Sequence, residues 1–205
     1  MIEIFNDPQN SPEWFMRRCG LGTCSDYPTL LMKGKGTAES KTRASLVKVK
    51  AAERFLGKPT DSYSNAHMER GHTMEQEVAD LYAFMEGVEP EVVGFVRNGM
   101  TGGSPDRFIG NNGILEIKTK LPHILIDVIQ DDKFPEEHKA QCQGLLMVTE
   151  REWIDIVCYW PGMPFFKKRA FRDEAYIATL KSAVDKFNDD VAALVEQLQQ
   201  YGKAA

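Results

Sequence analysis

Asp106, Glu116 and Lys118 are two acidic residues and a lysine whose spacing suits metal-dependent hydrolysis. The residues around them predict a hairpin, with Asp106 at the start of one strand and Glu116 and Lys118 on the next. Because side chains alternate between the faces of a strand, Glu116 and Lys118 project from one face and Ile117 from the other. Asp106 then faces Glu116 across the hairpin. Two such carboxylates form an oxygen-lined pocket for Mg²⁺ or Mn²⁺, which binds a phosphodiester and lowers the pKa of an attacking water.

The same short motifs also occur without a catalytic role. Ser-Pro-Asp at 104–106 is typical of a turn, and Glu-x-Lys at 116–118 is typical of a solvated strand face. Further motifs along the chain favour the catalytic interpretation. They are Trp14 to Arg18 and Thr23 to Ser25 near the N-terminus, Gly71 to Glu75 in a helical stretch, and Ala140 to Gln143 at the start of another helix.

In this order, the motifs resemble those of the phage λ exonuclease (YqaJ-like recombinase) family of the PD-(D/E)xK nuclease superfamily. The resemblance extends from Trp14 to about Trp160. It implies an α/β fold similar to that of restriction endonucleases, with a mixed central sheet flanked by helices. Arg107 departs from the family pattern, because many members have glycine there. Since a side chain disfavours positive φ, the shape of the turn after Asp106 stays open.

The resemblance implies a metal site built on the hairpin. Asp106 and Glu116 would bind the metal directly, together with the main-chain carbonyl of Ile117, and Lys118 would orient or activate water. Two Mg²⁺ ions per site are implied, with Mn²⁺ as a substitute. One ion would bind the attacking water and the other would bind the leaving oxygen.

Two helical residues complete the implied catalytic set. Glu75 would reach the metal ions directly or through water, and Gln141 would hold the attacking water or a water of the metal ion. The alternative for Glu75 is an ordinary acidic residue on a helix surface. The alternative for Gln141 is a solvated amide on a helix face.

A pocket for the terminal 5′-phosphate of DNA is also implied, at Arg18, Thr23, Ser25 and Ser104. The residue types agree with this role, because a guanidinium forms paired charge-assisted hydrogen bonds and hydroxyls add short donors. Ser25 also stands at a predicted helix N-terminus, which favours anions. Capping is the alternative for Ser25 and Ser104, and the two roles are compatible.

Two residues are expected to contact DNA beyond its end. Lys35 lies in the basic run at 33–40, where the family places a residue in the minor groove. Met68 lies where the family has an apolar wedge that helps to separate the terminal base pair. A methionine of the core is the alternative for Met68.

The activity that the resemblance implies is metal-dependent 5′→3′ exonuclease digestion of double-stranded DNA. Such a phage or prophage enzyme releases 5′-mononucleotides and leaves 3′ overhangs for recombination by strand annealing. The implied partners are DNA ends with a 5′-phosphate, two further copies of the chain in a ring-shaped homotrimer, and a single-strand annealing protein. Two alternatives stay open: a PD-(D/E)xK endonuclease of restriction type, and a catalytically inactive module that binds DNA ends.

The length of 205 residues suits a single α/β domain with a sizeable core. We expect one nuclease domain over 1–205, with a basic helical N-terminal part at 1–60, a catalytic α/β core at 61–172 and a C-terminal helix at 173–205. An apolar run of about eighteen residues and a basic, apolar leader are both absent, so we expect a cytoplasmic protein without a membrane span. The scattered cysteines lack a C-x-x-C pair, which argues against zinc and favours reduced thiols near the core: Cys19, Cys24, Cys142 and Cys158.

The net charge of −5 is unevenly distributed. Residues 14–58 contain ten Lys and Arg against three acidic residues, whereas 173–200 contains two against six. The basic segment suits contact with phosphates while the acidic helix faces elsewhere. Solvated helix faces are the alternative explanation.

The periodicity of apolar residues and the cap signals predict the following elements. Helices are expected at 13–18, at 26–32 with Ser25 as its cap, and at 41–55, 64–85, 121–130, 135–147 and 173–200. Strands are expected at 92–97, 106–110, 113–119, 153–159 and 165–170. Gly71 predicts a break or a close packing contact within its helix.

Overall fold

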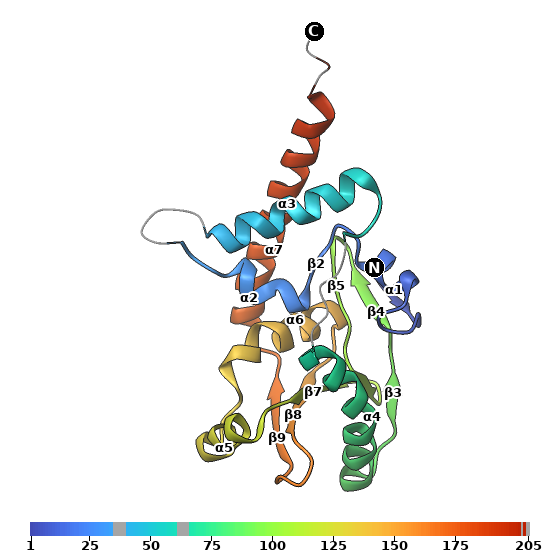
Figure 1. Cartoon of the computed structure of the whole chain (residues 1–205), viewed down its shortest axis with the longest axis vertical. Helices are drawn as coiled ribbons and strands as arrows, with labels where there is room; N and C mark the ends of the chain where they lie inside the picture. Colours follow the sequence, from blue (N-terminus) through green and yellow to red (C-terminus); the bar gives the residue numbers. More distant parts are fainter. Residues whose placement is uncertain (35–39, 61–65, 202, 204–205) are drawn as a thin grey trace.

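The computed structural model describes residues 1–34, 40–60, 66–201 and 203, and of 66–73 it describes the backbone alone. Figure 1 shows the arrangement of the elements. In chain order they are β1 (Ile2–Phe5), α1 (Pro12–Arg18), β2 (Gly22–Thr23), η1 (Cys24–Asp26), α2 (Tyr27–Leu30), α3 (Lys41–Leu56), α4 (Ala66–Glu86), β3 (Pro90–Val92), β4 (Phe95–Asn98), β5 (Thr101–Gly103), β6 (Arg107–Ile109), β7 (Gly113–Thr119), α5 (Pro122–Asp131), η2 (Glu136–His138), α6 (Lys139–Thr149), β8 (Trp153–Tyr159), β9 (Phe166–Phe171) and α7 (Glu174–Gln200).

The strands form two sheets, one in the order β1-β4-β5-β2 and one in the order β3-β6-β7-β8-β9. In the second sheet, β7 and β8 run parallel from the pair Gly113–Trp153 to the pair Thr119–Tyr159. The other neighbours in that sheet are antiparallel. Helices α5 and α6 lie in the connection from β7 to β8, as a parallel pair requires. The expected α/β class with mixed sheets and flanking helices is confirmed.

The prediction of one strand over 92–97 is wrong, because the chain changes sheets there. β3 ends at Val92 and β4 begins at Phe95, in the other sheet. Between them, Gly94 passes so close to the N-terminal segment that a Cβ would lie 2.2 Å from the main-chain oxygen of Asp7. Its N–H donates to the carbonyl of Phe5 at 3.1 Å. This crossing, together with the short strands β1, β2 and β5, was not predicted.

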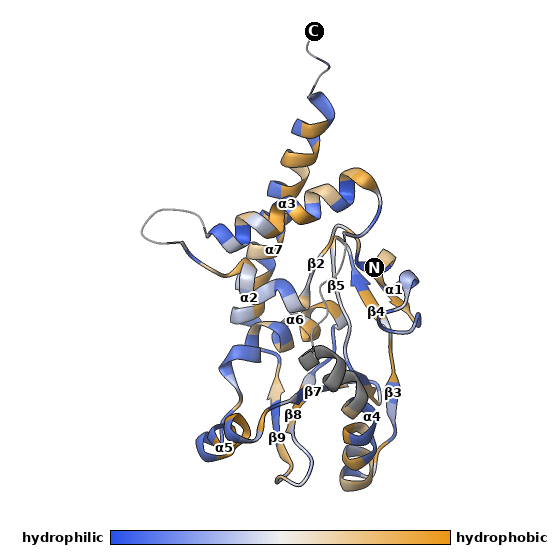
Figure 2. Ribbon diagram, in the orientation of Figure 1, coloured by the Kyte–Doolittle hydropathy of each residue, from blue (hydrophilic) through white to orange (hydrophobic). Residues whose placement is uncertain are grey.

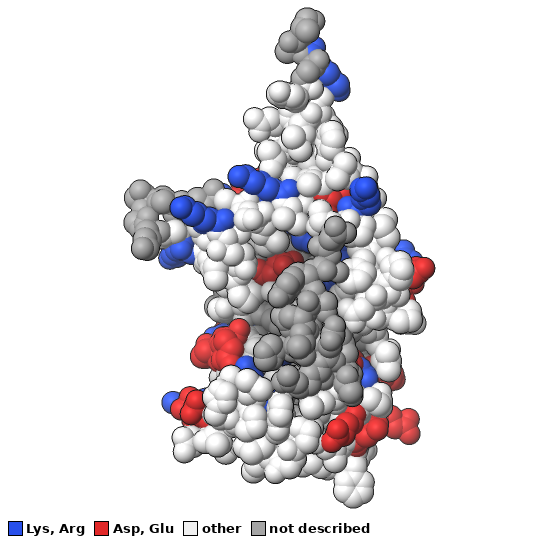
Figure 3. Space-filling view, viewed as in Figure 1, with Lys and Arg blue, Asp and Glu red and all other residues white. Residues whose placement is uncertain are grey.

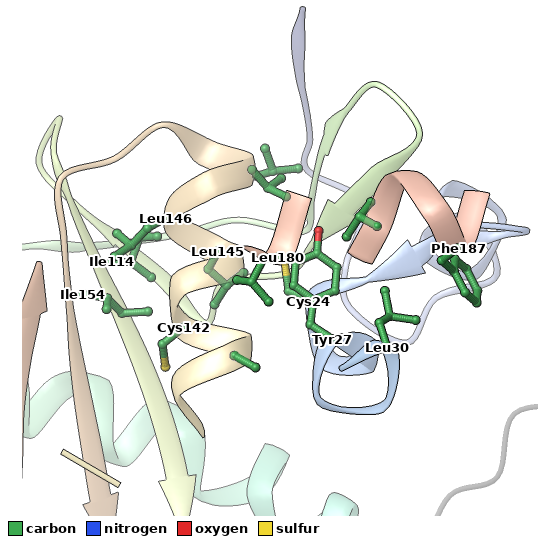
Figure 4. Close-up of a cluster of buried hydrophobic side chains, with 14 of the residues drawn as sticks. Cys24, Tyr27, Leu30, Ile114, Cys142, Leu145, Leu146, Ile154, Leu180 and Phe187 are labelled. Carbon is green, nitrogen blue, oxygen red and sulfur yellow. The ribbon is translucent and has the colours of Figure 1, made fainter. Parts of the chain in front are cut away.

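Helix α6 lies at the centre of the main core (Figure 4). Leu145 and Leu146 are fully buried, between the second sheet and the segment that contains Tyr27. The ring of Tyr27 lies against Gly144, where a Cβ would meet it at 2.5 Å. Glycine at this position therefore lets the N-terminal segment pack directly on α6, which fixes the position of Gln141 near the start of the helix.

The long helices follow the sequence closely. α3 is capped by Ser40 and is followed by Gly57, which has a positive φ, and α7 is capped by Asp173. Figure 2 shows hydrophobic and hydrophilic residues on different sides of α7. Five apolar residues of α7 are buried: Ile177, Leu180, Val184, Phe187 and Val191. No helix in the described part of the chain is long and apolar enough to span a membrane.

Several helix boundaries differ from the prediction. In place of a helix over 26–32 capped by Ser25, the chain forms the 3₁₀ turn η1, which contains Ser25 and is capped by Thr23, followed by the short helix α2. The carboxylate of Asp26 accepts hydrogen bonds from both the N–H and the hydroxyl of Thr23, each at 2.9 Å. The segment at 135–147 divides into η2 and α6. α4 continues through Gly71 without a break, and the contacts of Gly71 lie outside the described residues.

Candidate active site

The end of strand β6 positions the first carboxylate. Arg107 pairs with Leu115, so Asp106 and Glu116 are the next residues across the hairpin. Asp106 lies just before the first residue of β6, and its Oδ2 accepts a hydrogen bond from the N–H of Ile117 at 2.5 Å in place of a strand partner. The N–H and C=O of one strand residue point to the same edge. The carbonyl of Ile117 therefore lies on the Asp106 side of β7.

The second carboxylate, Glu116, lies at the centre of a hydrogen-bonded cluster. Its Oε1 accepts from Lys118 Nζ and from Gln141 Nε2, both at 2.6 Å. These contacts confirm that Glu116 and Lys118 project from one face, and they bring Gln141 of α6 to the same place. Glu116 is 1% exposed, and its Oε2 has no hydrogen-bond partner among the described residues. A buried carboxylate oxygen without a partner is costly, so this atom suits a cation.

The cluster holds more negative than positive charge. Burial raises the pKa of Asp106 well above its ordinary value, the charges of Glu116 and Glu75 raise it further, and Lys118 opposes them. Burial lowers the pKa of Lys118, but the charges of Glu116 and Asp106 outweigh it and raise that pKa overall. Carboxylates so close together ionise fully only when positive charge joins them. The arrangement therefore fits a divalent ion.

Glu75 reaches the cluster from α4, but a guanidinium holds it. Arg107 Nη1 donates to Glu75 Oε1 and, at 2.5 Å, to the carbonyl of Asp106, while its Nη2 donates to Gln76 Oε1 at 3.1 Å. Arg107 is the first residue of β6, is 6% exposed and does not have positive φ. The open question about the turn is thus answered, since the backbone of Arg107 is already part of the strand and its side chain contacts Glu75 and Gln76 of α4. Sequence reasoning did not predict this contact.

The metal-ligand set combines two kinds of oxygen. Asp106 and Glu116 supply carboxylates, and Ile117 supplies a main-chain carbonyl on the same side of the hairpin. Among the described residues, no group of three His, Cys, Asp or Glu side chains has a metal-binding arrangement. Glu75 therefore does not complete a third carboxylate ligand in this structure.

The four residues of the predicted phosphate pocket come together around Arg18, at the end of α1. Its guanidinium lies 3.4 Å from Ser104 Oγ, 3.2 Å from Thr23 Oγ1 and 3.5 Å from Ser25 Oγ. It also lies 4.1 Å from the ring centroid of Trp14, whose Nε1 donates to Ser104 Oγ at 2.9 Å. These hydroxyls are neutral, so they orient the guanidinium without neutralising its charge.

The pocket and the carboxylate cluster are adjacent. Ser104 belongs to the pocket, and Asp106, two residues later, belongs to the cluster. The side-chain amide of Gln9 holds the segment between them, donating to the carbonyl of Pro105 at 3.2 Å and to that of Val93 at 3.3 Å. Two residues of chain span at most about 7 Å, so one ligand can contact both places.

The contacts of Trp14 with Arg18 and Ser104 were not predicted from the sequence. A tryptophan four residues before an arginine on a helix is the only signal in the sequence, because residues at that spacing share a helix face. Of the two predicted DNA contacts, Lys35 lies outside the described residues. The backbone of Met68 belongs to α4, and its side chain lies outside the described residues.

The hairpin of β6 and β7 carries its carboxylates in the middle of a mixed sheet, which is the arrangement of a PD-(D/E)xK fold. A family model, the YqaJ-like viral recombinase domain, matches residues 13–152, and the chain belongs to that family.

Solved structures agree with this assignment. The alkaline exonuclease LHK-Exo from Laribacter hongkongensis is 28% identical, with a TM-score of 0.83, over 93% of this chain and 97% of that one. LHK-Exo in complex with dAMP has a TM-score of 0.85 at the same 28% identity, over 95% of this chain and 100% of that one. A phage-related exonuclease from Haemophilus somnus 129PT shares the fold, at 14% identity and a TM-score of 0.65, over 87% of this chain and 96% of that one. No curated protein matches the chain.

Proposed function

We propose that the chain is a metal-dependent 5′→3′ exonuclease of double-stranded DNA, which releases 5′-mononucleotides and leaves 3′ overhangs for recombination by strand annealing. The observation that carries this proposal is the position of the Arg18 pocket next to the cluster of Asp106, Glu116 and Lys118. Family membership and the similarity to an alkaline exonuclease support it. The complex of LHK-Exo with dAMP, a deoxynucleotide, supports a mononucleotide product.

The residues present fit Mg²⁺, with Mn²⁺ as a substitute. Glu116 Oε2 lacks a partner among the described residues, and Asp106 and the carbonyl of Ile117 lie at the same end of the hairpin. These residues would hold the ion, and two ions per working site are part of the proposal. A bound ion polarises the scissile phosphate and lowers the pKa of water.

Lys118 supplies a fixed positive charge beside the reacting phosphate. Its raised pKa keeps the ammonium protonated at neutral pH, so it acts as a hydrogen-bond donor rather than as a base. The ion pair with Glu116 holds it in place. Gln141 donates its amide N–H to Glu116, which leaves the amide oxygen to accept a hydrogen bond from the attacking water and so to orient it.

Arg18 and its hydroxyl partners bind the terminal 5′-phosphate in this proposal. Paired donors of a guanidinium match the oxygens of a phosphate. When that phosphate is in the pocket, the short segment from Ser104 to Asp106 places the first phosphodiester at the carboxylates. This geometry favours removal of one nucleotide at a time from an end.

The test compares linear duplex DNA carrying a 5′-phosphate with covalently closed circular DNA, both in Mg²⁺. Degradation of the linear substrate alone is the expected result. Cleavage of the closed circle would favour an endonuclease of restriction type, and binding of ends without cleavage would favour an inactive module. Asp106→Ala serves as the variant without catalysis.

The proposal extends to partners and place of action. We propose a ring-shaped homotrimer around DNA, a single-strand annealing protein as partner, and action in the cytoplasm of a host cell. The support is family resemblance and charge: Figure 3 shows Lys and Arg gathered over α3, and Asp and Glu gathered towards the other end, around α4 and α5. Light scattering after size-exclusion chromatography tests the trimer, and a monomer that still degrades long DNA without dissociating would contradict the ring.

A further inference from the structure

Arg107 is a buried cation within the carboxylate cluster, and the proposed mechanism gives it no task. Its side chain is 8% exposed and forms an ion pair with Glu75. The same guanidinium donates to the main-chain carbonyl of Asp106 at 2.5 Å. It therefore occupies the space between helix α4 and the ligand-bearing turn.

The number of charges in the cluster determines how many divalent ions it can accept. Contacts bring three carboxylates to this place: Arg107 bonds to Glu75 and to the carbonyl of Asp106, and the Asp106 carboxylate accepts from the N–H of Ile117, the residue after Glu116. Two of them have an ion-pair partner: Arg107 for Glu75 and Lys118 for Glu116. With all three carboxylates ionised, the cluster carries about one net negative charge, which a single divalent ion compensates.

A second divalent ion would meet a different environment. The carboxylate of Glu75 suits such an ion, but the guanidinium is already bonded to it. The added charge would also make the cluster strongly positive, since two divalent ions would outweigh the remaining negative charge. The phosphates of DNA would bring the negative charge that is lacking.

We infer that Arg107 takes the place of a second divalent ion at Glu75, so that the chain alone holds one ion and the second requires bound DNA. This inference rests on the proposed metal site at Asp106 and Glu116. It makes Arg107 a positioning residue, which acts through Glu75 and has no contact with the substrate in this role. The order of assembly follows: the first ion binds to the protein, and the second binds to the complex with DNA.

The experiment counts ions without DNA, and so does not depend on activity. Purified protein is titrated with Mn²⁺, and free Mn²⁺ is measured by electron paramagnetic resonance. About one ion per chain is expected for the wild type and about two for Arg107→Ala. The double variant Arg107→Ala, Glu75→Gln is expected to return to about one, because the second ion needs the carboxylate of Glu75.

Two controls distinguish the role of Arg107 from the proposed metal site on which it depends. Arg151→Ala removes a guanidinium from the other end of the same hairpin, where Arg151 donates to the carbonyls of Gly110 and Gly113, and it is expected to leave the count at about one. Asp106→Ala is expected to bind no ion, and unchanged binding by that variant would show that the metal site itself is misplaced. Circular dichroism checks the fold of each variant.

Two ions per chain in the wild type without DNA would overturn the role of Arg107 while leaving the metal site intact. A count that stays at one ion per chain in folded Arg107→Ala would also contradict the role of Arg107. A second ion that persists in the double variant would show that Glu75 is not its ligand, which also contradicts the inference.

Discussion

Two polar regions meet at the segment 104–106, and they differ in whether their charged groups have enough partners when no ligand is bound. In the Arg18 pocket, three hydroxyls and the ring of Trp14 surround one cation. In the carboxylate cluster, Glu116 keeps an oxygen without a partner among the described residues, and the pKa of Asp106 is raised. The pocket is thus preorganised for an anion, whereas the cluster gains stability only when a cation binds. Preorganisation favours specific binding of an anion, and the charge imbalance favours tight metal binding.

The largest effect is expected from removal of a group in the cluster. Asp106→Ala, Glu116→Ala and Lys118→Ala should each lower the cleavage rate on the order of 10³-fold or more, because metal binding or charge stabilisation is lost. The rate is measured on linear duplex DNA in Mg²⁺, with circular dichroism as a control for folding. Activity of Asp106→Ala at saturating Mg²⁺ would contradict the assignment of the cluster.

The charge imbalance should also appear in the stability of the metal-free protein. Because the folded state holds the Asp106 proton above the ordinary pKa of 3.8, the free energy of unfolding in EDTA should fall as the pH rises from there through the folded pKa. Mg²⁺ at about 100 times its Kd should add about 2.7 kcal/mol. Urea unfolding at several pH values measures both quantities.

Asp106→Asn is the control for this linkage, because an amide does not titrate. Its unfolding free energy should lose the contribution of Asp106 to the pH dependence and should respond little to Mg²⁺. Equal stabilisation of the wild type and of Asp106→Asn by Mg²⁺ would place the ion elsewhere.

In the pocket, Arg18→Ala should act on end recognition rather than on chemistry. The wild type should degrade 5′-phosphorylated duplexes faster than 5′-hydroxyl duplexes. The variant should lose on the order of 2 kcal/mol of transition-state stabilisation, and only with the phosphorylated substrate. Lys35→Ala should weaken both substrates alike and flatten the salt dependence. Time courses on the two substrates measure the difference.

Arg17→Ala is a matched control for Arg18→Ala. Arg17 lies on the same helix, but its guanidinium bonds to Asp7 at 2.9 Å and lies over the ring of Phe5. The end preference should therefore persist in Arg17→Ala. If Arg18→Ala slows both substrates equally, Arg18 contacts the DNA backbone or supports the fold instead.

The smallest effect is expected from Trp14→Phe. This change keeps an aromatic ring beneath Arg18 but removes the N–H that orients Ser104, a hydrogen bond worth about 1 kcal/mol. The preference for a 5′-phosphate should fall by a factor of about five, with little change in the rate on 5′-hydroxyl ends. A loss on both substrates would indicate a general structural role.

The sequence predicted the parts of the fold and site that depend on neighbouring residues. Glu116 and Lys118 were placed on one face by strand alternation, and the helix expected at 41–55 agrees closely with α3. The change of sheet at Gly94 was missed, because apolar residues lie on both sides of it and its cause is a contact with the distant N-terminal segment.

The grouping of Arg18 with Ser104 came from the family pattern, since no local spacing joins residues so far apart. The contacts of Arg107 with Glu75 and of Trp14 with Ser104 were missed for a related reason. Each joins a helix to a strand end, so it depends on how the helix packs. Periodicity along the chain carries no information about that packing.

The hydrogen bond from the Ile117 amide to the Asp106 carboxylate offers a probe of the site. An amide proton bonded to a carboxylate changes its chemical shift when that carboxylate loses a proton or binds an ion. The Ile117 resonance in a ¹⁵N-correlated spectrum should therefore follow metal loading directly, without DNA and without a label at the site. A backbone position thus reports on the occupancy of a side-chain ligand.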